Sequence, residues 1–407
     1  MKEIIIAIIT GAILAGIALG RYPFFRMNRA TIALIGSLLL IAVGAITLEQ
    51  AYTAIDMNTI LLLFSMMIIN AYLQFSGFFS LVAREVLVLA KTPRQLLLLL
   101  VISSGILSAV FLNDTIVLIF TPLVLEILHY VERNPIPYLI ALATAANIGS
   151  AATIIGNPQN MLIGMYSHIP FGTFTASLLP VSLVNLLVIY FVIILIFRKD
   201  FSHEQLPVSS GIIRPRIHKP LLIKSMLVTL GMLIALIAGI SIPLAAFAGA
   251  SILLFTRRLK PERVFSEINW TLLVFFSGLF VVTRSIETSG ILSHLISYMG
   301  TFAGKSIANI AIVSAVLSNI VSNVPAVLLL EPLMRAYENT TQGWLTLAMA
   351  TTYAGNLTLI GSVANLIVAE SARLRGVHLS FIAYCKIGIL VTLISLLLGI
   401  LWLDVIL

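Results

Sequence analysis

The sequence predicts an all-α polytopic membrane protein with about ten transmembrane helices and two re-entrant hairpins, built as two inverted-topology repeats. Hydrophobic residues make up 60% of the 407 residues and charged residues 10%, which is more apolar side chain than one soluble core could bury. Apolar runs of about 17 to 25 residues, the length that spans a bilayer, recur along the chain. Polar motifs interrupt these runs, and each motif occurs once in each half.

The apolar runs long enough to span a membrane lie at residues 4–20, 30–48, 58–75, 136–166, 173–197, 221–238, 242–255, 269–286, 343–370 and 379–403. Two of them, 136–166 and 343–370, are interrupted and are predicted to be broken helices. Two further segments, about 95–128 and 305–334, are too long for one span and break near the middle. Short amphipathic helices along the interface are predicted at 78–89 and 291–299, one before each of these long segments.

Charge placement predicts that the two long segments are re-entrant hairpins. Arg84, Lys91 and Arg94 precede the first segment and Arg133 follows it, so both of its ends lie on the same basic side. Irregular backbone at membrane depth requires cover by protein or by a water-filled cavity. The hairpin tips are therefore expected to lie against other helices or a cavity.

The distribution of Lys and Arg also predicts the orientation in a cytoplasmic (inner) membrane. Most basic residues, with Arg21, Arg26 and Arg29 among them, fall in connections predicted to be cytoplasmic, which leaves both termini external. Each half contributes about five spans, an odd number, so the second half must be inverted relative to the first. The first repeat is expected at 1–199 and the second at 220–407, joined by a cytoplasmic linker at 200–219.

The hairpin breaks carry the first duplicated motif. Leu112-Asn113-Asp114-Thr115 interrupts the first hairpin and Ser322-Asn323-Val324-Pro325 the second. A helix that restarts at such a break presents free N–H groups and a positive dipole end, and Asn113 or Asp114 could cap them. Proline fits the same design because it is tolerated in a first helical turn.

The broken helices carry the second motif, Thr153-Ile154-Ile155-Gly156-Asn157-Pro158-Gln159-Asn160 in the first half and Thr358-Leu359-Ile360-Gly361-Ser362-Val363-Ala364-Asn365 in the second. Four helix starts aimed at one volume in mid-membrane would bind an anion, and the freed carbonyls before each break could coordinate a transient sodium ion. The candidate substrate and ion ligands are Asn113, Asp114, Thr115, Thr153, Gly156, Asn157, Asn160, Ser322, Asn323, Thr358, Gly361, Ser362 and Asn365.

Asp114 is a carboxylate predicted at bilayer depth, where insertion scales assign an acidic side chain a cost of about 2.5 to 3.5 kcal/mol. It is either a proton- or cation-linked group or a helix cap. Glu331, on the second limb of the other hairpin, is a candidate for lining the cavity. Thr144, Asn147 and Asn356 either line the same cavity or tie helices together by hydrogen bonds.

With these motifs the chain resembles the ion transporter superfamily, specifically relatives of arsenite permeases, sodium/proton antiporters and divalent-anion:sodium symporters. The string from Ala146 to Asn160 is similar to the family's first broken-helix signature, with Gln159 where a second proline is common. Ser322-Asn323-Val324-Pro325 resembles the arsenite-permease and antiporter form of the second hairpin tip. Dicarboxylate symporters have Ser-Asn-Thr at both tips, and Leu112-Asn113-Asp114-Thr115 departs from that pattern.

The resemblance covers nearly the whole chain and implies an elevator-like mechanism, with a scaffold that often forms a homodimer. We therefore expect a secondary permease for arsenite, another oxyanion or a carboxylate such as citrate, coupled to sodium, protons or the membrane potential. A sodium/proton antiporter is the nearest alternative, and Asp114 favours it. An intramembrane enzyme is disfavoured because all six histidines fall at loop or interface positions, and a channel is a remote alternative. No cofactor and no nucleic-acid partner are expected.

Overall fold

A computed structural model describes residues 2–19, 27–201, 206, 216–290 and 302–407. These ranges contain nineteen α-helices, one short 3-10 helix and no strand. Most of the predicted linker at 200–219 and the predicted helix at 291–299 lie outside the described residues. The all-helical class predicted from the sequence is confirmed.

The helices of the first half run in the following order: α1 (Lys2–Leu19), α2 (Arg29–Ala42), α3 (Leu48–Ala54), α4 (Met57–Ser76), α5 (Phe78–Leu89), α6 (Pro93–Val110), α7 (Asn113–Tyr130), α8 (Ile136–Ser150), α9 (Pro158–Ser167) and α10 (Phe171–Ile196). The short 3-10 helix Arg198–Asp200 follows. The predicted interfacial helix at 78–89 coincides with α5.

The second half repeats this order of long and short helices: α11 (Lys219–Ile237), α12 (Ile242–Leu254), α13 (Pro261–Ser266), α14 (Trp270–Thr288), α16 (Ile307–Val321), α17 (Asn323–Ala336), α18 (Thr340–Ala354), α19 (Val363–Arg373) and α20 (Phe381–Ile406). Seven of the described helices are long and apolar enough to cross a membrane, namely α4, α6, α7, α10, α11, α14 and α20. Five shorter apolar helices accompany them, so the chain is a multi-pass membrane protein. The total of ten spans stays a prediction.

The helices are interrupted at the duplicated motifs. Only Phe111 and Leu112 separate α6 from α7, and only Ser322 separates α16 from α17. The broken helices are the pairs α8–α9 and α18–α19. A short irregular connection separates the two helices of each pair. The N-cap Asn157 then starts α9, and the N-cap Ser362 starts α19.

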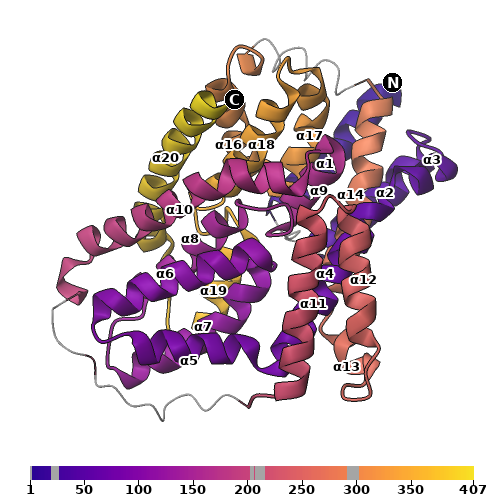
Figure 1. Ribbon diagram of the computed structural model, residues 1–407. Helices are drawn as coiled ribbons and strands as arrows, with labels where there is room; N and C mark the ends of the chain where they lie inside the picture. Colours follow the sequence, from indigo (N-terminus) through magenta and orange to yellow (C-terminus); the bar gives the residue numbers. More distant parts are fainter. Residues whose placement is uncertain (1, 20–26, 202–205, 207–215, 291–301) are drawn as a thin grey trace.

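Helix packing is reciprocal between the halves. α2 packs on α14 and α12 on α4, α6 on α8 and α16 on α18, α7 on α19 and α17 on α9. Each pair maps onto another when every helix is replaced by the one ten places away, as two copies of one repeat would give. Figure 1 places α5, α6 and α7 in the lower part of the molecule and α16, α17 and α18 in the upper part. The inverted repeat remains our interpretation of this arrangement.

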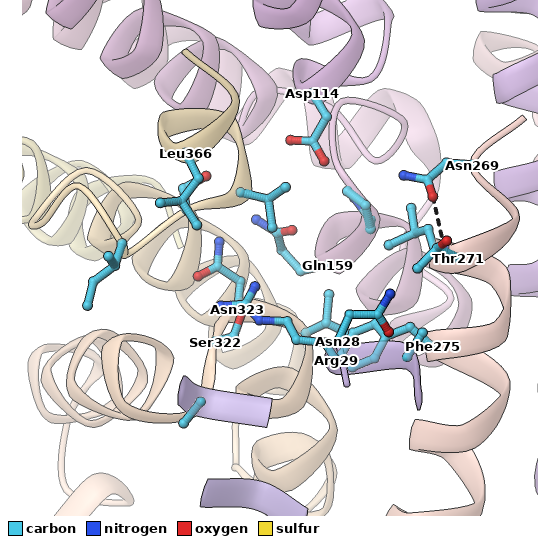
Figure 2. A pocket seen from close by; sticks show the side chains of 18 of the residues that line it. Asn28, Arg29, Asp114, Gln159, Asn269, Thr271, Phe275, Ser322, Asn323 and Leu366 are labelled. Carbon is cyan, nitrogen blue, oxygen red and sulfur yellow. Dashed lines mark hydrogen bonds between the residues drawn. The ribbon is translucent and has the colours of Figure 1, made fainter. Parts of the chain in front are cut away.

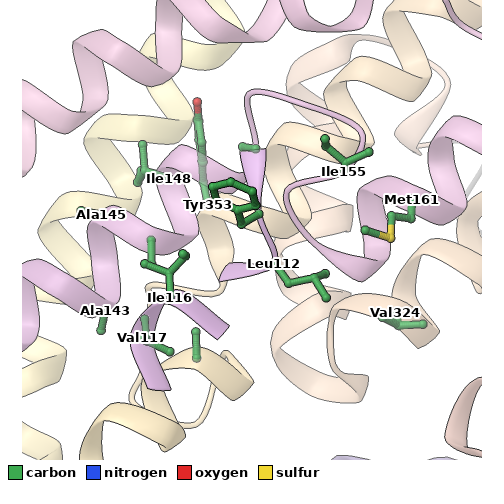
Figure 3. Packing of buried hydrophobic residues seen from close by; sticks show 14 of the residues in the cluster. Leu112, Ile116, Val117, Ala143, Ala145, Ile148, Ile155, Met161, Val324 and Tyr353 are labelled. Carbon is green, nitrogen blue, oxygen red and sulfur yellow. The ribbon is translucent and has the colours of Figure 1, made fainter. Parts of the chain in front are cut away.

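The breaks are held together by close packing. A Cβ atom on Gly149 of α8 would overlap the backbone of Gly105 on α6, and one on Gly156 would lie 2.8 Å from the Ser108 carbonyl oxygen. Around them, apolar side chains of the first hairpin tip, α8 and the broken-helix connections pack into one cluster (Figure 3), and Leu112, Ile116 and Ile155 are 4% exposed or less. The polar breaks are thus set in a dense apolar matrix.

Candidate functional site

A pocket of about 750 Å³ lies where the breaks meet (Figure 2). Its described lining comes from the ends and starts of several helices: Ala18, Leu19, Asn28, Arg29, Ala30, Asn113, Asp114, Pro158, Gln159, Asn269, Thr271, Leu272, Phe275, Ser322, Asn323, Val324, Ile360, Ser362, Val363 and Leu366. Both polar and apolar side chains contribute to it. It is large enough for a small organic or inorganic solute.

Six helix N-termini contribute to this lining. The starts of α7, α9, α17 and α19 are the four that the sequence predicts. The starts of α2 and α14 join them, where the N-cap side chains Asn28 and Asn269 accept hydrogen bonds from Thr31 N and Leu272 N. Each start contributes N–H groups and a positive dipole end, so the pocket is electrostatically suited to an anion.

Asn147 links the two halves beneath the pocket. Its Oδ1 accepts hydrogen bonds from Asn113 Nδ2 at 3.1 Å and from Ser362 Oγ at 3.0 Å. Its Nδ2 donates to Asn356 Oδ1 at 2.8 Å and to Asn365 Oδ1 at 3.0 Å. The side chain is 2% exposed, so Asn147 ties helices together and is absent from the described lining of the pocket.

The other predicted residues of the broken helices also serve their connections. Asn160 Nδ2 donates to the carbonyl oxygens of Ser150, Ala151 and Thr153, and Asn365 Nδ2 donates to those of Gly355 and Thr358. Asn157 caps α9 by accepting from Asn160 N at 2.8 Å. These bonds satisfy carbonyls that a broken helix leaves free. They also occupy oxygens that we expected to be available to a cation.

The first hairpin tip is closed against its broken helix. Asn113 N donates to Gly156 O at 3.1 Å, and Thr153 Oγ1 donates to Ala109 O. Thr115 Oγ1 accepts from Asn70 Nδ2 of α4 at 3.3 Å. Eight predicted residues therefore position the pocket-lining residues and are themselves absent from the described lining: Thr115, Thr153, Gly156, Asn157, Asn160, Thr358, Gly361 and Asn365. The described lining also lacks Thr144, Asn147, Asn356 and Glu331.

Asp114 faces the pocket without acting as a cap. The N-cap of α7 is Leu112, no side chain caps that helix, and Asp114 N donates its hydrogen bond to Asn113 Oδ1 at 2.9 Å. Within the described ranges the structure gives the Asp114 carboxylate no hydrogen-bond donor. Its negative charge therefore faces the pocket, which weakens the cap interpretation.

Arg29 is the charged residue of the pocket that sequence reasoning missed. Counting basic residues placed it in a cytoplasmic loop with Arg21 and Arg26, but it is the first residue of α2 and lines the pocket. Figure 2 shows Arg29 and Asp114 on opposite sides of the space. The sequence signal was Asn28, a preferred capping residue directly before an apolar run.

Glu331 lies away from this pocket. Arg335 Nε donates to Glu331 Oε1 within α17, the second limb of the second hairpin, and the Arg335 guanidinium carbon lies 5.9 Å from the centre of the Tyr166 ring on α9. Thr144 donates to carbonyls of its own helix, and Thr144 O accepts from Asn356 Nδ2. The packing of helices accounts for all three positions.

The second hairpin tip has a strained backbone. Ser322, which lines the pocket, has φ 81° and ψ 160°, a conformation that glycine adopts freely and other residues adopt at a cost of about 1 to 3 kcal/mol. Strain of this kind persists where the surroundings fix the backbone, and it clusters at functional sites.

A Ser322→Gly substitution should therefore raise the unfolding temperature of the purified protein, because it relieves the strain without adding atoms. It should also lower transport, because the hydroxyl leaves the pocket. Thermal unfolding in detergent and uptake by liposomes measure the two effects. Ser289→Gly, at a C-cap with φ −78°, is the control and should give no stabilisation; an equal gain from both changes would contradict the strain argument.

The sequence also matches known proteins. The family model for citrate transporters (CitMHS) matches residues 5–354. The chain is 30% identical to the silicon efflux transporter LSI3 of Oryza sativa subsp. japonica over 86% of each chain, and 31% identical to a 46 kDa membrane protein of Mycobacterium leprae over 91% of this chain and 92% of that one. It is 25% identical to the putative transporter arsB of Dictyostelium discoideum, over 92% of this chain and 87% of that one.

The fold also matches a solved structure. The crystal structure of the Alcanivorax borkumensis YdaH transporter superposes with a TM-score of 0.62 over 99% of this chain and 98% of that chain, at 12% identity. At this identity the match speaks for the fold alone. The family match and the transporter relatives agree with the resemblance to the ion transporter superfamily and exclude the intramembrane enzyme. The chain is a membrane transporter that belongs to the citrate transporter family.

Proposed function

We propose that this protein is a secondary active permease that moves a small anion, such as arsenite, another oxyanion or a carboxylate, by an elevator-like alternating-access mechanism. The observation that carries the proposal is the convergence of six helix N-termini on one pocket. Free N–H groups and dipole ends favour an anion over a cation there. Arg29 adds a full positive charge to the same lining.

Access to the breaks from one side supports alternating access. A second pocket of about 720 Å³ is lined by the starts of α4 and α12 and the end of α9, with Asp56, Tyr166 and Ser241 among its residues. These elements are the counterparts of α14, α2 and α19 around the first pocket. None of the four break motifs lines the second pocket within the described ranges. A permease that exposes its site to one side at a time would have this asymmetry, whereas a channel would not.

The contact pattern supports a moving body. The helices of the two hairpins, the broken helices, α10 and α20 pack mainly on one another, and α1–α4 pack mainly with α11–α14. The pocket lies between these two groups, because Asp114 and Asn323 belong to the first group and Arg29 and Phe275 to the second. We interpret the first group as the carrier and the second as the scaffold, through which a homodimer would form.

The named relatives favour the permease over a sodium/proton antiporter. The matching family is described as citrate transporters and the rice relative as a silicon efflux transporter. Sodium or a proton is then the proposed coupling ion and not the main substrate. We place the protein in the cytoplasmic membrane with both termini external, and the start of α1 and the end of α20 lie at the same end of the molecule (Figure 1).

Uptake by reconstituted liposomes tests the proposal. Purified protein is screened with arsenite, sulfate, citrate and sodium under imposed pH, sodium and voltage gradients. Gradient-driven accumulation of one of the three oxygen-containing solutes is expected. Sodium/proton exchange without transport of any of these three solutes would favour the antiporter function instead. Passive flux at rates above those of carriers would indicate a channel.

The inverted repeat predicts opposite membrane sides for two exposed connections. In a Cys385→Ser background, which removes the single native cysteine, Glu49→Cys on α3 and Arg258→Cys between α12 and α13 should react with an impermeant maleimide from opposite sides. Both side chains are exposed, so accessibility alone does not distinguish them. Labelling of both from one side would contradict the predicted topology.

A further inference from the structure

The guanidinium of Arg29 is anchored at one end and free at the other. Arg29 Nε donates to the Ile17 carbonyl oxygen at the end of α1, at 3.1 Å. The described part of the chain offers no hydrogen-bond acceptor to the two terminal amino groups. The side chain is only partly buried and lines the pocket, so these donors face the space that the solute would occupy.

Arg29 and Asp114 are the two charged groups of the described lining. They come from different bodies, Arg29 from α2 of the scaffold and Asp114 from α7 of the first hairpin. No salt bridge joins them among the described residues, and Figure 2 shows them across the pocket from each other. A charged solute placed between them would be attracted by one and repelled by the other, so Arg29 can offset Asp114 for an anion.

The described lining of the second pocket contains no arginine or lysine, and His168 is its one residue that can carry a positive charge. α12 is the counterpart of α2, and its first residues Ser241-Ile242-Pro243 stand where α2 has Asn28-Arg29-Ala30. They line the second pocket, where the described carboxylate is that of Asp56. Because Arg29 belongs to the scaffold, a carrier that moves the solute toward the second pocket would separate it from this guanidinium.

We propose that Arg29 is a substrate-discriminating residue that binds the anion in the first pocket alone, and so gives the transporter unequal affinities on its two sides. This inference rests on the proposed function, since it assumes an anionic substrate. Arg29 offers two terminal amino groups in a planar arrangement, which suits a carboxylate or an oxyanion. An uncharged solute would gain little from it, so Arg29 favours anions over neutral hydroxy compounds.

Binding to purified variants tests the role of Arg29. Calorimetric titration with citrate, sulfate and uncharged silicic acid compares the parent with Arg29→Gln, Arg29→Lys and the exposed control Arg258→Gln. Arg29→Gln should weaken the anion that the parent binds by about ten- to a hundredfold, the range of a hydrogen bond to a charged group, and leave silicic acid unaffected. Arg29→Lys should give an intermediate loss, and Arg258→Gln none.

Sidedness separates this role from a merely structural one. The orientation of the protein in the liposomes is determined by labelling the cysteine variants. With this orientation known, Arg29→Gln should raise the half-saturating anion concentration more on the side of the first pocket than on the other. An equal rise on both sides, or parent-like affinity in a folded Arg29→Gln protein, would overturn the proposal. If Arg29→Gln does not fold, Arg29→Lys decides, and parent-like anion affinity in it counts against the proposal. A parent that binds neither anion would contradict the anionic substrate itself.

Discussion

Replacement of Asn323 by alanine should lower anion uptake by about ten- to a hundredfold, the loss expected for a hydrogen bond to a charged group. Ser318 Oγ donates to Asn323 Oδ1 at 2.6 Å, which fixes the orientation of the amide. Asn323 Nδ2 then has no acceptor within the described part of the chain and faces the pocket. The side chain thus offers a preoriented donor to the solute.

The matched change at the other tip should have a second effect. Asn113 Nδ2 donates to Asn147, so Asn113→Ala also removes one bond from the buried network and should lower the unfolding temperature as well as uptake. Uptake per folded molecule, measured in liposomes with protein amount and thermal unfolding recorded in parallel, separates the two. Loss of protein with unchanged specific activity at both sites would indicate that both asparagines serve packing alone.

Asn319→Ala is the control for the Asn323 experiment. Asn319 lies one turn before the tip, and its Nδ2 donates to Ala315 O and Ala354 O at 3.0 Å. Because it is absent from the described lining of the pocket, its loss should lower stability without changing the half-saturating anion concentration. A change in that concentration equal to the change in Asn323→Ala would show that the tip responds to any local damage.

The breaks in the helices could be predicted because local chemistry fixes them. Asn157-Pro158 and Ser362 start helices by capping, and their duplication in both halves separates them from chance kinks. The bounds of α5 could be predicted for the same reason, since an amphipathic run between Gly77 and basic residues has one apolar face. Such signals lie within a few residues of the feature that they predict.

The roles of Asn147 and Arg29 could not be predicted, because both depend on packing between distant segments. Asn147 bonds to Asn356 and Asn365, more than 200 residues away, and nothing near it in the sequence distinguishes a tie between helices from a ligand. Charge counting treats Arg29 as a topology signal. Its place in the pocket follows from the packing of α2 on α14.

Replacement of Asp114 by asparagine should flatten the dependence of transport on pH and on sodium. Asn keeps the size of the side chain and one oxygen but removes the titratable charge. The structure leaves that charge facing the pocket, since Asp114 caps no helix and receives no described hydrogen bond. A carboxylate placed in this way suits an exchangeable proton or sodium ion better than a fixed structural partner.

The measurement is gradient-driven accumulation of the anion at several pH and sodium values, with anion binding recorded separately. Asp114→Asn should lose coupled accumulation and retain anion binding, with affinity equal to or above that of the parent because a repulsive charge is gone. Asp404→Asn, the same change at an exposed site near the end of α20, should behave as the parent. Asp114→Asn with the parent's full accumulation at every pH and sodium level would assign coupling to another group and leave Asp114 as a source of electrostatic repulsion that Arg29 offsets.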